Sequence, residues 1–174
     1  MENSDENFYY DITEKDYLWK SEEMKLVIDS IRATMRNGRG RVLEIGCGIA
    51  GIIPYLPEGV EYIGTDISEY GLERARTIHR GANVQFKAMS ADSLSFEDSF
   101  FDFIIAFNVI EHCRRPQVVL DEILRVLRPG GRIALTGPNL DFPLSLSNGI
   151  RHRSKWYKMF IKTLIYNYVY YKSF

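Results

Sequence analysis

Apolar residues along this chain occur mainly as short runs separated by stretches with helical spacing. Short runs rich in β-branched and aromatic residues, bounded by glycine, proline or acidic residues, are typical of β-strands. The run at 101–107 is apolar almost throughout, as expected of a strand buried on both faces. These runs predict five strands, at residues 41–45, 60–65, 84–87, 101–107 and 132–136.

The segments around these runs have helical periodicity or helix-start signals. Ser68 is a suitable N-cap residue, and Pro116 is suited to the first turn of a helix. Pro54 and Pro57 should end the helix after the first strand early, because proline removes a backbone donor. The expected helices are most of 14–36, a short one from about 49, 68–79 and 118–127.

Alternation of strands and helices predicts an α/β fold with a doubly wound, mostly parallel sheet and helices on both faces. With 174 residues and 45% hydrophobic content, the chain suits one globular domain. We divide it into a helical lid or cap region at 1–40, a ligand-binding core at 41–139 and a basic, aromatic C-terminal segment at 140–174.

Composition excludes several classes of protein. Cys47 and Cys113 are the two cysteines, which is too few for a disulfide framework. There is no run of about 20 apolar residues to span a bilayer, and the acidic start MENSDENFYY does not resemble a signal peptide. We therefore expect a cytoplasmic protein.

The net charge of −1 conceals an asymmetry. Residues 151–174 contain six basic and no acidic residues, so the rest of the chain is acidic. The core is therefore not expected to bind nucleic acid, whereas the tail could contact an anionic partner.

The first predicted strand runs into a glycine-rich turn, EIGCGIAG at 44–51. Gly46 permits a sharp exit from the strand, and Gly48 lets the backbone lie against a ligand without a Cβ between them. Asp66, 20 positions after Gly46, ends the second predicted strand, where a carboxylate can accept hydrogen bonds from both ribose hydroxyls. The pattern predicts an adenosine-containing ligand and leaves NAD and S-adenosylmethionine (SAM) open; capping of the following helix is the alternative role of Asp66.

Five successive motifs resemble the core of class I SAM-dependent methyltransferases, above all the methyltransferase type 11-like group that acts on small molecules, quinones and glycans. The resemblance implies a Rossmann-like fold, SAM as cofactor and S-adenosyl-L-homocysteine as product. It also implies in-line methyl transfer to a small-molecule, lipid-linked or glycan-linked acceptor that remains unidentified. The motifs are VLEIGCGIAG (42–51), GTDIS (64–68), SADSLSF (90–96), FDFIIAFNVIEH (101–112) and RVLRPGGRIALTGPN (125–139).

The resemblance also implies the cofactor contacts. On the methionine side, Gly46 and Gly48 would flank the ligand above Glu44, whose carboxylate would repel the pyrophosphate of NAD. Cys47 belongs to this turn but is also suited to packing. Phe107 and Asn108 would contact the methionine or sulfonium, with a core position as the alternative for Phe107. On the adenosine side, Asp66 would bind the ribose and Ile67 would pack on the adenine face. Asp92, flanked by Ala91 and Ser93, would bind the adenine amino group. A turn residue is the alternative role of Asp92.

Glu111 and His112 are the catalytic candidates, because they follow the fourth predicted strand beside the expected methyl position. An imidazole is suited to removing a proton from a hydroxyl acceptor near neutral pH. A role in loop structure is the alternative. Some similar enzymes bind a divalent metal with a Glu-x-x-Glu-His cluster, but Asn108 stands at the first of these positions, so no metal is predicted.

The two ends are less typical. Tyr9 and Tyr10 are candidates for a lid over the site. After Gly137 no clear hairpin turn follows, so the sixth and seventh strands usual in such folds could be absent or altered. A helix at 151–165 would carry a basic stripe opposite an apolar face, which suits a membrane interface, the sheet edge or a second subunit. The chain could also be part of a longer enzyme, and a catalytically silent SAM-binding or interaction module is the alternative function.

Overall fold

The computed structural model describes residues 22–35, 37–138 and 161–167. The description therefore excludes Tyr9, Tyr10 and most of the basic tail, and the predictions made for them stay untested. The helices of the structure are α2 (Glu22–Thr34), α3 (Glu69–Ile78) and α4 (Pro116–Val126), and the short 3₁₀ turns are η1 (Ile53–Tyr55) and η2 (Ile110–His112). Its strands are β1 (Gly40–Ile45), β2 (Val60–Asp66), β3 (Val84–Ala88), β4 (Phe101–Phe107), β5 (Leu127–Pro138) and β6 (Ile161–Asn167).

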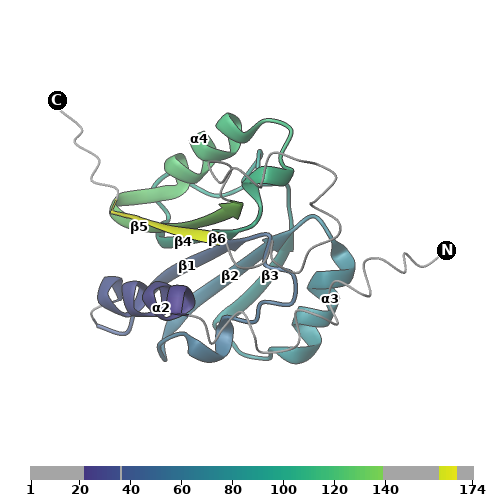
Figure 1. Ribbon diagram of the computed structural model, residues 1–174. Helices are drawn as coiled ribbons and strands as arrows, with labels where there is room; N and C mark the ends of the chain where they lie inside the picture. Colours follow the sequence, from purple (N-terminus) through teal and green to yellow (C-terminus); the bar gives the residue numbers. More distant parts are fainter. Residues whose placement is uncertain (1–21, 36, 139–160, 168–174) are drawn as a thin grey trace.

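The strands form one twisted sheet in the order β3-β2-β1-β4-β5-β6 (Figure 1). Strands β1 to β5 pair parallel with one another, and β6 pairs antiparallel with β5. The chain builds the sheet outward from β1 to β3 and then returns to the other side of β1 with β4. Such a reversal opens a crevice at the carboxyl ends of the strands, which is where ligands bind in open α/β sheets.

The predicted doubly wound architecture is confirmed, with one layer of helices on each face of the sheet. Helices α2 and α3 cover one face and α4 the other (Figure 1). Successive residues of β4 alternate between these layers: Phe103 packs in the cluster with α2 and α3, and Ile104 packs in the cluster with α4. Residues 101–106 are all buried, as the apolar run predicted.

The local signals placed most elements correctly. The Ser68 hydroxyl caps α3 by accepting a hydrogen bond from the Gly71 N–H at 3.3 Å. Pro116 begins α4. The expected short helix near residue 49 is reduced to the 3₁₀ turn η1, with Pro54 in its first turn.

The fifth strand is longer than predicted. It begins at Leu127, directly after α4, because Leu127 already pairs with Phe101 of β4. The next pair along the two strands is Phe103 with Arg132. Residues 128–131, which include Pro129, form an irregularity between these two pairs. Proline and glycine therefore interrupt the pairing here without ending the strand.

The helix considered for 151–165 is not formed in its described part. Residues 161–167 form β6, whose register runs from Arg132 opposite Asn167 to Pro138 opposite Ile161. The segment IKTLIYN is rich in β-branched and aromatic residues, and the edge of β5 offers it unpaired backbone groups. One antiparallel strand thus follows the parallel sheet. In the described segments no helix is long and apolar enough to cross a membrane.

Candidate functional site

The turns after β1, β2 and β4 meet at the carboxyl edge of the sheet. Ile45 pairs with Thr65 on one side and Ala106 on the other, so the residues that follow these three positions are neighbours. The structure thereby brings Gly46, Asp66 and Phe107 to one edge. This is the edge at which the strand order predicts a ligand site.

Gly46 is required by close packing of two of these turns. Its φ of +67° is unfavourable for other residues. A Cβ at this position would lie 2.4 Å from Cγ2 of Val109, in the loop after β4. The missing side chain therefore makes room for Val109, a role that the sequence did not indicate, while Gly48, with φ +52°, continues the turn.

Asp66 joins the glycine-rich turn to the start of α3. Its Oδ2 accepts a hydrogen bond from the Gly48 N–H at 2.8 Å, and its Oδ1 accepts one from the Ser68 N–H at 2.9 Å. Each carboxylate oxygen has a further lone pair, so the group can still accept two hydroxyl hydrogen bonds. The expected capping role and the expected ribose contact are therefore compatible.

Glu44 is buried beneath the turn. The Tyr62 hydroxyl donates a hydrogen bond to its Oε2. Gly64 leaves the necessary space, since a Cβ there would lie 2.8 Å from the Cys47 sulfur and 3.0 Å from the Tyr62 oxygen. Burial raises the pKa of Glu44 from 4.5 to about 8; the Tyr62 hydrogen bond opposes this rise, and the charge of Asp66 adds to it.

A carboxyl group with this pKa is mostly protonated at pH 7. The sequence argument that a Glu44 carboxylate would repel the pyrophosphate of NAD is therefore not supported. Glu44 contributes a neutral, hydrogen-bonded support beneath the turn.

Cys47 is a packing residue in this structure. Its side chain is buried in the cluster with α2 and α3, and burial raises the pKa of its thiol above the usual value. Its backbone N–H donates to the Thr65 carbonyl at 3.0 Å, tying the turn to β2. A thiol held protonated in this way is a poor nucleophile.

The residues expected around the adenosine lie after β2 and β3. Ile67 is 80% exposed although it is large and apolar, and it directly follows Asp66. Ala91 is buried, whereas Ser93 is exposed and donates its N–H to the Ser90 carbonyl at 3.2 Å.

Asp92 makes two side-chain contacts in this turn. It accepts hydrogen bonds from the Ser90 hydroxyl at 2.6 Å and from Nη2 of Arg115 at 2.8 Å. The Ser90 hydrogen bond, followed by that of Arg115, lowers the pKa of Asp92. Arg115 was missed by the sequence analysis, because only the fold brings it to a residue 23 positions earlier.

The methionine-side candidates lie at the end of β4. Phe107 is partly buried against the cluster with α2 and α3, in keeping with its alternative core role. Asn108 has φ +53°, a conformation that asparagine adopts more readily than most residues. Its N–H lies 3.1 Å from the carbonyl oxygen and 3.2 Å from the hydroxyl of Thr136 on β5.

The catalytic candidates lie together in η2. His112 is exposed. Glu111 is half-buried, and its Oε2 is inaccessible to solvent without a hydrogen-bond partner among the described residues. A buried carboxylate oxygen normally has a partner, so this atom is an exception to the usual pattern. Within the described ranges, no group of three or more His, Cys, Asp or Glu side chains is placed to hold a metal ion.

Comparison with known proteins finds methyltransferases among the similar sequences. The chain is 36% identical over 108 residues to a fatty-acid O-methyltransferase from Mycolicibacterium smegmatis, a match that covers 59% of this chain and 39% of the relative. It is 32% identical over 95 residues to a ubiquinone biosynthesis O-methyltransferase from Sinorhizobium fredii, covering 52% and 38%. The chain thus spans about two fifths of the length of these curated relatives.

Solved structures share the fold. A SAM-dependent methyltransferase from Aquifex aeolicus superposes with a TM-score of 0.60 at 20% identity, over 72% of this chain and 68% of that chain. Residues 43–135, which run from within β1 to within β5 and include every predicted cofactor-binding and catalytic residue, match the family described as methyltransferase domain. The chain therefore belongs to this methyltransferase domain family, and it shares its fold with a SAM-dependent methyltransferase.

Proposed function

We propose that this chain binds SAM at the edge formed by the turns after β1, β2 and β4 and takes part in methyl transfer to a small-molecule, lipid-linked or glycan-linked acceptor. The observation that carries the proposal is the carboxylate of Asp66. Two backbone N–H groups, of Gly48 and Ser68, orient it at the end of β2, beside the glycine-rich turn that follows β1.

The described residues fit the parts of SAM. Asp66 accepts hydrogen bonds from the ribose hydroxyls, and the exposed Ile67 side chain covers the adenine face. Asp92, with Ala91 and Ser93 beside it, accepts a hydrogen bond from the adenine amino group. The turn at Gly46 to Gly48, above the neutral Glu44, would hold the methionine part, with Phe107 and Asn108 near it.

SAM, when bound, supplies a methyl group on a sulfonium that needs no further activation. The protein's task is then to align an acceptor and exclude water. His112, exposed in η2, is positioned by the same turn as Glu111 and removes the proton of a hydroxyl acceptor. The names of the relatives support acceptors of lipid or quinone type.

The proposal is tested by calorimetric titration of the purified chain with SAM, S-adenosyl-L-homocysteine and NAD. We expect binding of the first two, weakened about tenfold or more in Asp66→Asn, because a charge-assisted hydrogen bond is lost. Glu61→Gln is the matched control, since Glu61 is an exposed acid on the same strand. Tighter binding of NAD, or an Asp66→Asn variant with unchanged affinity, would contradict the proposal.

Binding alone does not distinguish an enzyme from a catalytically silent SAM-binding module. Methyl transfer to a panel of fatty acids, quinols and glycans separates the two, because a silent module binds SAM and transfers to none. The predicted membrane contact or dimer through 151–174 remains a separate proposal.

A further inference from the structure

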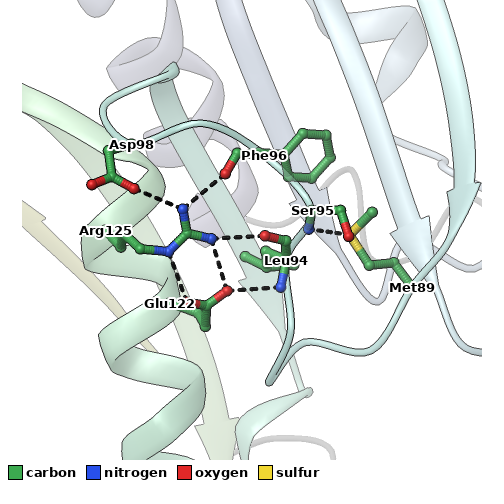
Figure 2. Close-up of polar contacts among 7 residues, drawn as sticks. All are labelled: Met89, Leu94, Ser95, Phe96, Asp98, Glu122 and Arg125. Atoms are coloured by element: carbon green, nitrogen blue, oxygen red, sulfur yellow. Dashed lines mark hydrogen bonds and ion pairs between the residues drawn. The ribbon is translucent and has the colours of Figure 1, made fainter.

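The guanidinium of Arg125, on α4, is saturated with hydrogen bonds (Figure 2). Its Nη1 donates to the Phe96 carbonyl and to Asp98, both at 2.8 Å. Its Nη2 donates to the Leu94 carbonyl at 2.7 Å and to Glu122 at 2.9 Å, and its Nε donates to Glu122 at 2.8 Å. All five N–H groups of the side chain thus have an acceptor.

Glu122 completes the arrangement from the same helix. Its Oε2 also accepts a hydrogen bond from the Leu94 N–H at 2.8 Å (Figure 2). The two side chains therefore bind both backbone groups of Leu94, as a neighbouring strand would. We call Glu122 and Arg125, with their contacts to Leu94, Phe96 and Asp98, the α4 clasp.

The clasp holds a segment with no regular secondary structure of its own. Residues 89–100 connect β3 to β4 through turns, so no ladder of backbone hydrogen bonds fixes their position. At the start of the segment, the Met89 N–H donates to the Asp66 carbonyl at 2.9 Å. The turn with Ala91, Asp92 and Ser93 lies between this anchor and the clasp.

Helix α4 also contacts this turn at its other end. Arg115, the N-cap residue of α4, forms the ion pair with Asp92. A rigid helix that binds the segment at both Asp92 and Leu94 determines where the intervening backbone lies. Each hydrogen bond of the clasp involves the charged guanidinium or the carboxylate. Such bonds are stronger than hydrogen bonds between two neutral groups.

We propose that Arg125 and Glu122 are positioning residues for recognition of the adenine base: by fixing Leu94 against α4 they hold Asp92 where it reads the adenine amino group. The inference rests on the proposed function. It predicts that the clasp controls discrimination between bases as well as the stability of the loop.

The test compares binding of S-adenosyl-L-homocysteine with binding of S-inosyl-L-homocysteine, in which a carbonyl replaces the adenine amino group. The variants are Arg125→Gln, Arg125→Lys and Glu122→Gln. Lysine cannot reproduce the five-donor fork, so it should not rescue binding. Arg32→Gln is the matched control, because Arg32 forms an ion pair with Asp29 three residues away on the surface of α2.

In the wild type we expect about a tenfold preference for the adenosyl ligand, the usual worth of one good hydrogen bond to a charged group. In the Arg125 and Glu122 variants this preference should largely disappear, and amides of residues 90–99 should exchange faster with deuterium. Arg32→Gln should change neither. Should Arg125→Gln fail to fold, Glu122→Gln, which keeps the side-chain shape, decides the question.

Folded clasp variants with faster exchange at 90–99 but an unchanged preference would overturn the inference and leave the clasp a purely structural role. A wild type that binds the two ligands equally would also overturn it, because Asp92 would then not read the base. A wild type that binds neither SAM nor S-adenosyl-L-homocysteine would instead refute the proposed function itself.

Discussion

The Tyr62 hydroxyl donates a hydrogen bond to the carboxyl group of Glu44, and both side chains are buried beneath the glycine-rich turn. The two residues lie on the neighbouring strands β2 and β1. Burial raises the pKa of each group, and the proximity of Glu44 raises that of Tyr62 further. The pair is therefore neutral over most of the physiological range, and ionising Glu44 costs folding free energy.

Glu44→Gln should make stability less dependent on pH. The folded-state pKa of Glu44, about 8, lies above the unfolded value of 4.5, so its contribution to stability is full below pH 4.5 and is lost as the pH rises to about 8. Glutamine does not ionise and can still accept the Tyr62 hydrogen bond. We expect equal stability at pH 4.5 and a variant more stable by roughly 2–4 kcal/mol at pH 8.

Urea unfolding at several pH values measures this difference. Glu61→Gln, which changes an exposed acid on β2, should leave the pH dependence as in the wild type. A constant difference between Glu44→Gln and wild type across this range would show that Glu44 is ionised in the folded protein.

Gly46→Ala should destabilise the domain by about 2–4 kcal/mol, because the new Cβ meets Val109 and the backbone there has a positive φ. Val109→Ala in the same chain should recover part of this loss, since it removes the methyl group that the Cβ would strike. A double-mutant cycle measured by thermal unfolding isolates the contact. Additive effects of the two substitutions would mean that only the backbone conformation requires glycine.

His79 links α3 to the segment after the glycine-rich turn, with Nε2 3.0 Å from the Ile49 carbonyl. Partial burial lowers its pKa below 6.5, and the Ile49 carbonyl opposes the shift. The unfolded chain therefore binds a proton more readily, so this contribution to stability is present above pH 6.5 and is lost as the pH falls below it. In His79→Gln this part of the pH dependence should vanish; a steeper loss on acidification in the variant would contradict it.

His112→Ala should affect acceptors unequally. A hydroxyl acceptor such as a quinol must lose a proton, so its kcat should fall about 100-fold or more without a base. A fatty acid is already a carboxylate at neutral pH and should lose little. Steady-state rates with both acceptors test this, and calorimetry should find the same affinity for S-adenosyl-L-homocysteine. Equal losses for both acceptors would assign His112 a structural role.

Local signals predicted the parts of this fold that depend on local chemistry. The apolar run of β4, the Ser68 cap and the Pro116 helix start each act within a few residues, so they could be read directly from the sequence. The position of Asp66 beside the glycine-rich turn followed from strand order and spacing. These features predicted that Gly46, Asp66 and Phe107 would lie at one carboxyl edge of the sheet, as they do.

The features that were missed depend on contacts between distant residues. Arg125 meets Leu94 and Phe96 only because α4 packs beside the segment after β3. The protonation of Glu44 depends on its burial with Tyr62, which no local pattern reports. Residues 161–165, at the end of the segment considered as a helix, are in a strand because the edge of β5 supplies pairing partners. A basic stripe with helical spacing does not reveal that edge.

The two hydrogen bonds that Asp66 accepts affect the thermodynamics of ligand binding. Its carboxylate is already held by two amide groups, so its rotamer is selected before a ligand arrives and little side-chain entropy remains to be lost on association. A sugar hydroxyl that binds the Asp66 carboxylate replaces water at lone pairs that already point toward the ligand. Affinity at this edge should therefore reflect the enthalpy of the new contacts more than any cost of assembling the receptor.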